Sequence, residues 1–139
     1  MLRQTVTQIF SSSPFFADMD GQDKSFIRLK CALILNRLLD KNKSRYASNL
    51  NNGLSDLELV HNLSQVSSST GLRPATISNI FNGDSAPSVT SLLHILDVLG
   101  SSMTQFGVAY DEASELEVVE FEKELNSKKE RELVKKGKQ

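Results

Sequence analysis

The sequence contains few of the residues on which enzymes and metal sites depend. Its 139 residues include one cysteine, two histidines and no tryptophan. A single cysteine excludes an internal disulfide framework and a zinc site built from several cysteines. Cys31 has no histidine nearby in the sequence, and His61 and His94 each stand alone, so none of them predicts a nucleophile or a metal ligand. With no glycine-rich phosphate loop either, we expect no enzyme, no metal and no cofactor.

Long apolar runs are also missing. No stretch approaches the roughly 20 apolar residues needed to span a bilayer. The first residues contain Arg3 but no apolar run of signal-peptide length before the polar residues 11–13. We therefore expect a cytoplasmic protein with no membrane partner.

A large excess of either charge is lacking as well. The net charge is −1, but the bases and acids are unevenly distributed. Residues 1–23 carry one base and three acids (−2), residues 24–109 eight bases and five acids (+3), and residues 110–139 seven bases and nine acids (−2). The middle segment is mildly basic, far from the strongly basic footprint of a nonspecific nucleic-acid binder. Binding to nucleic acid would therefore depend on a local patch.

The chain has the length of one domain. Its composition divides it into an N-terminal arm (1–23), a central domain (24–109) and a charged C-terminal helix or tail (110–139), partly disordered. The arm has no clear hydrophobic period, and Asp20 and Gly21 indicate a turn. We expect the arm to lie on the domain or, alternatively, to form a swapped dimer contact.

Residues 23–40 predict a helix, because no glycine or proline interrupts an apolar pattern of helical period. Its buried face is expected to contain Ile27, Cys31, Ile34 and Leu38. Four further apolar residues widen that face: Phe26, Leu29, Leu33 and Leu35. Such a helix is either central in the fold or also part of a subunit contact.

The polar segment 41–53 predicts a loop that ends in an Asn-Gly turn. Ser55 and Glu58 then have the spacing of a capping box. The pattern leaves open whether the helix that they start runs unbroken into the next one or is interrupted at Asn62.

Two helical segments are expected near the end of the chain. Ser88 can cap a helix whose inward residues are expected to be Val89, Leu92, Leu93, Leu96 and Leu99. A short helical turn over 101–106 follows and closes the core with Phe106. Farther on, a thin apolar stripe contains Leu116, Val119 and Leu125. We expect the last basic residues, 135–138, to be disordered.

Between these segments, the stretch 62–83 has the pattern of two short helices joined by a tight turn. Asn62 can cap the first helix, and Gly71 can end it in a left-handed conformation. Pro74 lies where the second helix begins, at a position with no intrahelical hydrogen bond to lose. One apolar stripe follows, formed by Ile77, Ile80 and Phe81. This is the anatomy of a helix-turn-helix.

This pattern resembles the lambda repressor-like, or XRE, helix-turn-helix family. The resemblance extends from Asn62 to Phe106 and is carried by Val66-Ser67, Gly71-Leu72, Thr76-Ile77-Ser78, Phe81-Asn82-Gly83, Pro87-Ser88, Leu92, Ile95-Leu96 and Leu99-Gly100. It implies an all-α fold, a five-helix DNA-binding domain, here with an N-terminal arm and a charged C-terminal helix or tail. It also implies a bacterial or phage regulator, usually a homodimer, whose third helix enters the major groove of a palindromic operator in double-stranded DNA.

Two features depart from the family pattern. Residues 41–61 separate the first two helices, where the family has only a few residues. The family's second helix opens with a glutamine that contacts a phosphate, and the equivalent position here is Leu63, with Ser64 or Gln65 as substitutes. Both departures concern the docking geometry on DNA.

Carried over by position, the resemblance places the DNA contacts on and beside the helix from Pro74 to Phe81. The expected DNA-binding residues are Gln65, Arg73, Pro74, Ala75, Thr76, Ser78, Asn79 and Asn82. Among them, Asn79 has the side chain that can pair in bidentate fashion with adenine. Arg73 and Asn82 flank the helix and would contact phosphates. Asp84, beside the same surface, would oppose an approaching phosphate.

Three functions are compatible with the sequence. The first is a sequence-specific transcriptional regulator, most simply a repressor, that binds its operator as a homodimer. The second is the antitoxin of a toxin–antitoxin pair, which would bind a toxin protein through residues 1–23 or 110–125. The third is a protein-interaction module that has kept the fold and lost DNA binding, as the weak basicity and Asp84 would favour.

Overall fold

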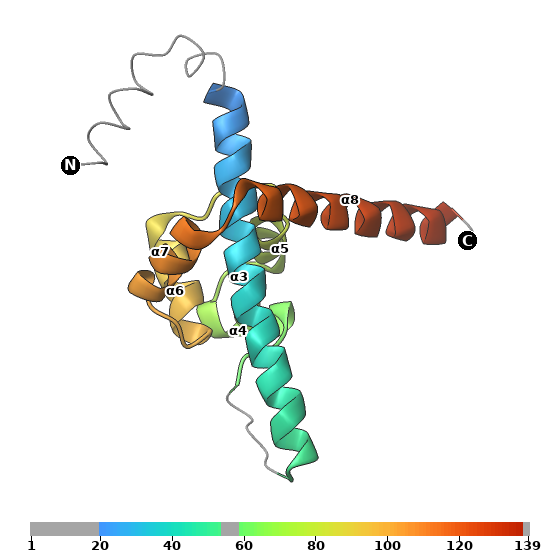
Figure 1. Ribbon diagram of the computed structural model, residues 1–139. Helices are drawn as coiled ribbons and strands as arrows, with labels where there is room; N and C mark the ends of the chain where they lie inside the picture. Colours follow the sequence, from blue (N-terminus) through green and yellow to red (C-terminus); the bar gives the residue numbers. More distant parts are fainter. Residues whose placement is uncertain (1–19, 54–58, 138–139) are drawn as a thin grey trace, which may run out of the picture.

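The computed structural model describes residues 20–53 and 59–137, and within these ranges the chain forms six helices and no strand. A long helix, α3 (Asp20–Asn51), runs through the molecule, and another, α8 (Glu115–Gly137), crosses it (Figure 1). Four shorter helices pack beside α3: α4 (Leu63–Thr70), α5 (Pro74–Phe81), α6 (Val89–Val98) and α7 (Met103–Glu112). The predicted all-α fold class is confirmed for the described residues.

Parts of the sequence-based prediction fall outside these ranges. Residues 1–19 of the expected arm and the expected capping box at 55–58 are not among the described residues. The turn expected at Asp20 and Gly21 is wrong, since α3 begins at Asp20. Leu59 to His61 are not helical and Asn62 caps α4, so of the two alternatives left open, the interruption is the one observed.

The predicted loop over 41–53 is wrong for most of its length, because α3 continues to Asn51. Tertiary contacts explain the difference. Asn42 is buried, and its Nδ2 donates hydrogen bonds to the carbonyl oxygens of Val60 (2.8 Å) and Leu99 (3.2 Å). One helical turn farther on, the Tyr46 ring stacks on His61 with 3.8 Å between ring centroids. Only the Asn-Gly turn at the end of the segment is confirmed.

The buried face of α3 also differs from the predicted one. Ile27 is 46% exposed, and Cys31 and Leu38 are only half-buried. The fully buried residues of this helix are Ala32, Leu33, Ile34, Leu35, Leu39 and Asn42. Helices α5, α7 and α8 all pack on α3. The buried residues from Ala32 to Leu39 therefore lie on more than one side of the helix. Of the two expected roles of α3, the central one is observed.

The remaining core residues come from each of the shorter helices and from the start of α8. They are Val66, Ile77, Ile80, Phe81, Leu92, Ile95, Leu96, Leu99, Phe106, Ala113 and Val118. Two α6 residues expected inward, Val89 and Leu93, are exposed, and Ile95 takes an inward position instead. α7 is longer than the predicted turn and starts with a capping box between Ser102 and Gln105.

A hydrogen-bonded cap starts α8 and a single buried face holds it on α3. The Ser114 backbone N–H donates to Glu117 Oε2 (2.9 Å), and Glu117 N–H donates to Ser114 Oγ (3.2 Å). The first of these hydrogen bonds, aided by the nearby Arg37 guanidinium, lowers the pKa of Glu117.

The predicted apolar stripe of α8 is wrong for Leu116 and Val119, and of its three residues only Leu125 is half-buried. Leu116 is 67% exposed and Val119 is exposed, whereas Val118 is buried and Phe121 packs on the core. Residues 135–137, expected to be disordered, belong to the last turn of this helix. No helix in the described ranges is both long and apolar enough to span a bilayer.

Candidate nucleic-acid interface

The turn between α4 and α5 is fixed by side-chain hydrogen bonds. Asn62 Oδ1 accepts from the backbone N–H of Gln65 (2.8 Å) at the start of α4. At its end, Gly71 has φ +76°, and the Gly71 N–H donates to the Ser67 carbonyl (2.9 Å). The buried Ser67 Oγ then donates to the Leu72 carbonyl (2.6 Å). These bonds set the angle at which α5 leaves α4, as a helix-turn-helix requires.

The far end of α5 is attached to α3. Asn36 Nδ2 donates to the carbonyl oxygen of Phe81 (2.8 Å) and to that of Ala32 (2.7 Å). Together with the buried Ile77 and Ile80, this bond holds one side of α5 against the core. No local sequence pattern identifies Asn36, because its partner Phe81 lies 45 residues away along the chain.

The outer side of α5 contains the residues expected to contact bases. Of the predicted site residues, Arg73, Pro74, Ala75 and Asn79 are exposed, and Gln65, Thr76, Ser78 and Asn82 are half-buried. Arg73 precedes the helix in an extended conformation, and its side chain does not cap it. Seven of these residues lie on α5 or at its two ends, whereas Gln65 lies on α4.

Hydrogen bonding distinguishes the polar residues on this surface. Asn82 Nδ2 donates to Ser78 Oγ (3.3 Å), so these two side chains hold each other. Asn79, by contrast, is exposed, and its side chain forms no hydrogen bond within the ranges that the structure describes. Its amide can therefore both donate to and accept from a ligand, which is the chemistry of adenine recognition.

Gln65 occupies a different place from the one the family pattern implies. Its Oε1 accepts from the His61 backbone N–H (2.7 Å), which ties it to the segment that precedes α4. The first residue of α4 is Leu63, which is 37% exposed and cannot donate a side-chain hydrogen bond. At this end of α4, the Gln65 Nε2 group and the exposed Ser64 hydroxyl are left to donate to a phosphate.

Asp84 is neutralised by a residue that the sequence analysis did not associate with the site. Lys129 Nζ on α8 lies 3.6 Å from Asp84 Oδ1, and Arg28 Nη1 donates to the Asp84 carbonyl oxygen (3.4 Å). The negative charge next to α5 is therefore paired within the chain. No local pattern could reveal this pair, since 45 residues separate its members.

Other kinds of site find little support in the described residues. No group of three or more histidine, cysteine or carboxylate side chains in that part of the chain could hold a metal ion. Burial raises the pKa of the Cys31 thiol, which disfavours the thiolate. The surface around α5 remains the best-formed candidate.

The comparisons with known proteins agree with this geometry. A helix-turn-helix family model, of the lambda repressor-like or XRE type, matches residues 61–106. The matched segment contains α4, α5 and α6 and ends within α7. Comparison with curated proteins and comparison with solved structures find no match.

Proposed function

We propose that this chain, whose residues 61–106 form a helix-turn-helix domain of the lambda repressor-like family, is a sequence-specific transcriptional regulator that represses from an operator. The family is one of DNA-binding regulator domains, not of enzymes. The observation that carries the proposal is the unoccupied amide of Asn79 on the exposed side of α5. A helix with this placement enters the major groove and presents such side chains to base edges.

The other predicted site residues have supporting roles in this proposal. Ala75 can contact a thymine methyl group, and Thr76 and Ser78 can hydrogen-bond to base edges. Arg73 and Asn82, at the two ends of α5, contact phosphates and fix the register of the helix on the duplex. Pro74 is the first residue of α5. Gln65, on α4, donates a hydrogen bond from its side-chain amide to the phosphate backbone of the DNA. The cell compartment that fits this function is the cytoplasm of a bacterium, including one that carries a phage.

The test compares Asn79→Ala with the wild-type chain on operator DNA. The DNA is taken from the region upstream of the chain's own reading frame or selected from a random library. Fluorescence anisotropy gives the affinity at two salt concentrations. We expect nanomolar operator binding by the wild type and a loss of roughly 1–3 kcal/mol for Asn79→Ala on the operator alone. Asn51→Ala, an exposed asparagine at the end of α3, is the matched control and should change nothing.

Equal binding of operator and random DNA by the wild type would contradict sequence-specific recognition. Absence of DNA binding would favour the interaction-module alternative. Equal losses for Asn79→Ala and Asn51→Ala would leave a regulator, but with the bases contacted by other residues.

The antitoxin function is the second candidate, and one observation favours it. The first part of α8, residues 115–125, carries five acids and one base, and Leu116 and Val119 are exposed on it. An acidic helix with exposed apolar side chains suits a small basic partner. A reading frame for such a protein next to this one, and its co-purification with the chain, would support this alternative over a simple repressor.

A further inference from the structure

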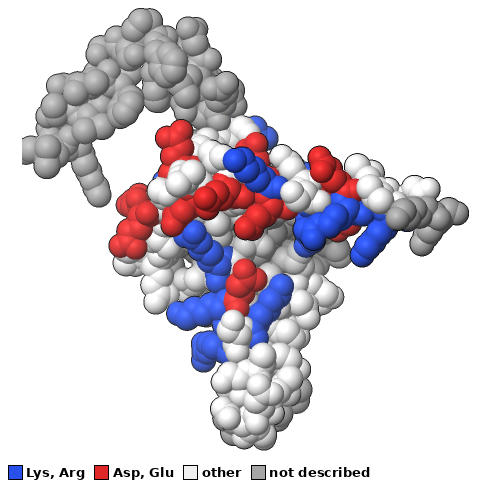
Figure 2. Space-filling view, turned by 45° about the vertical axis from the view of Figure 1, so that its right-hand side comes forward, with Lys and Arg blue, Asp and Glu red and all other residues white. Residues whose placement is uncertain are grey.

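The charges of α8 are divided along its length. Residues 115–125 have a net charge of −4, from five acids and one base, whereas residues 126–137 have +3, from five bases and two acids. The acidic part lies on the body of the molecule, and the basic part extends beyond it (Figures 1 and 2). The weak overall charge of the chain therefore conceals a local basic segment.

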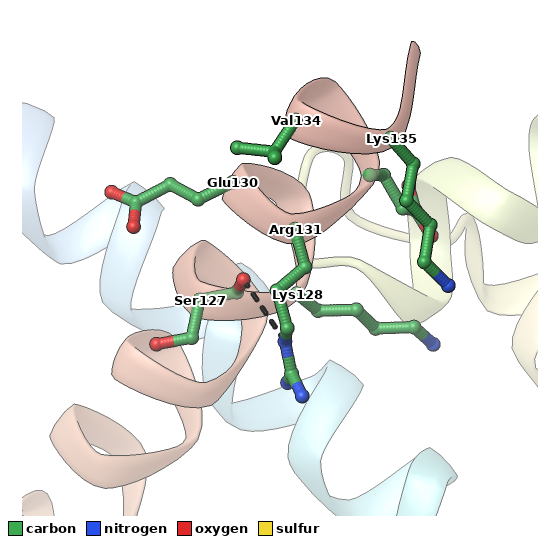
Figure 3. Close-up of a pocket in the computed structure, with 7 residues that line it drawn as sticks. Ser127, Lys128, Glu130, Arg131, Val134 and Lys135 are labelled. Atoms are coloured by element: carbon green, nitrogen blue, oxygen red, sulfur yellow. Dashed lines mark hydrogen bonds between the residues drawn. The ribbon is translucent and has the colours of Figure 1, made fainter. Parts of the chain in front are cut away.

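The bases of this segment share one face of the helix. At 3.6 residues per turn, all five fall within an arc of roughly 160°. They are Lys128, Lys129, Arg131, Lys135 and Lys136. Glu132 is the one acid within that arc. Figure 3 shows Lys128, Arg131 and Lys135 directed to one side of α8 and Glu130 and Val134 to the other. The residues drawn there line a pocket, and all of them belong to α8, so this pocket is a solvent-facing side of one helix.

This basic face continues the face with which α8 packs on the domain. Val118, Phe121 and Leu125 point in nearly the same direction around the helix as the bases that follow them. Val118 is buried and Phe121 packs on the core, so this direction is toward the body. Beyond Leu125, apolar residues on this face give way to basic ones, and Lys128 and Lys129 are the last of these bases that line grooves shared with α3.

A salt bridge places this face beside the candidate interface. Lys129 Nζ pairs with Asp84 Oδ1 at 3.6 Å, and Asp84 lies in the turn directly after α5. A groove at this point is lined by residues of α8 and of the turn after α5, among them Asn126 and Asn82. From Lys129 to the end of α8 the helix extends by about 12 Å. The outer bases therefore extend up to about this distance from the turn at the C-terminal end of α5.

The fold itself makes no use of these outer bases. Lys135 and Lys136 are exposed, and neither forms an ion pair within the described residues. Arg131 donates only to the Ser127 carbonyl of its own helix (3.4 Å). Unpaired cations held on a rigid helix beside a base-contacting surface suit the phosphates of a duplex.

We propose that the outer half of α8 (126–137) is a second DNA contact, which binds the phosphate backbone next to the groove entered by α5. This inference rests on the proposed function. Lys129 neutralises Asp84, and Lys128, Arg131, Lys135 and Lys136 neutralise phosphates. The contact adds affinity without sequence preference, which compensates for the mild basicity of the central domain.

The test is the triple variant Arg131→Gln, Lys135→Gln and Lys136→Gln in the full chain. We expect at least about a tenfold reduction in affinity at low salt, equal on operator and random DNA. The slope of log K against log salt should fall by about one for each phosphate that the variant no longer neutralises. The matched control is Lys123→Gln, an exposed lysine on the opposite face of the same helix. It should bind DNA like the wild type, and circular dichroism should show unchanged helix content in both variants.

The outcomes separate this inference from the proposed function. If the triple variant retains the wild-type affinity and salt slope while Asn79→Ala loses operator preference, α8 does not touch DNA and the regulator stands. An altered oligomeric state with unchanged DNA binding would assign α8 to a protein contact and also overturn the inference. If the wild type binds no DNA, the proposed function fails, and the inference fails with it.

Discussion

At the scale of single residues, buried asparagines connect distant parts of the chain. Asn42 lies in the second half of α3, is only 4% exposed, and bonds to carbonyl groups before α4 and after α6. Neither carbonyl belongs to a regular helical bond pattern at that point, so each needs an external donor. Asn42 is therefore the residue that joins the extension of α3 to the helix-turn-helix.

We predict that Asn42→Ala destabilises the protein by about 2–3 kcal/mol, because it leaves two buried carbonyl oxygens without a donor. Urea unfolding followed by circular dichroism measures the change. Lys43→Ala, one residue on and exposed, should change the free energy of unfolding by less than about 0.5 kcal/mol. Similar values for the two variants would show that water satisfies the two carbonyls.

The same residues show what a sequence can and cannot reveal. Asn62, Gly71 and Pro74 act on backbone groups a few residues away, so their roles as cap, stop and start were predicted correctly. Asn36 and Asn42 also donate to carbonyl groups that lie 18 to 57 residues away. Their side chains look like those of any polar helix residue until the fold brings the partners together.

At the scale of elements, apolar periodicity predicted that helices exist but not which face they bury. Ile27 and Leu116 fit the predicted stripes and are exposed, since no helix within 20–53 and 59–137 covers them. The polar composition of 41–51 predicted a loop, although the segment has neither glycine nor proline and Asn42 anchors it as helix. Helix α8 packs on the core through a face centred on Val118, and not through the predicted Leu116 and Val119.

The turn between α5 and α6 is the element whose glycine the packing requires most strictly. Gly83 has φ +74°, and a Cβ atom there would lie 2.9 Å from Leu29 Cδ2 and 3.3 Å from Leu29 Cα. Gly71 has nearly the same backbone conformation, φ +76°, but a Cβ atom there would meet nothing within 4 Å. The two positions therefore separate backbone strain from steric overlap.

We predict that Gly71→Ala costs about 1 kcal/mol, the penalty of a left-handed conformation for a residue with a Cβ atom. Gly83→Ala should cost at least about 2 kcal/mol, because the overlap with the α3 backbone adds to the same penalty. It should also lower operator affinity more, since the turn positions Asn82 and the Lys129–Asp84 pair. Equal costs in thermal unfolding would mean that Leu29 and α3 move aside freely.

At the scale of the whole molecule, one domain offers a short recognition element. Helix α5 has eight residues, a length of about 12 Å, which spans only a few base pairs. Tight operator binding then needs two copies on two half-sites. Most of the apolar face of α3 is buried within the chain, and only Ile27 and Leu50 are exposed large apolar side chains on its described part. A further group of exposed apolar side chains lies on α6 and α7: Val89, Leu93, Met103 and Val108.

We predict that two chains bind one operator whose half-sites lie about 34 Å apart, one turn of the duplex. Moving the half-sites apart by half a turn should reduce affinity to that of a single half-site, because the two α5 helices would then face opposite sides of the duplex. Moving them by a full turn should restore the facing and part of the affinity. Sedimentation velocity with labelled DNA gives the stoichiometry of each complex. One chain per duplex, with the same affinity for a half-site as for the full operator, would contradict the dimer. It would also leave α8 to supply the additional affinity, and the triple variant should then lose most of that affinity and about three units of the salt slope.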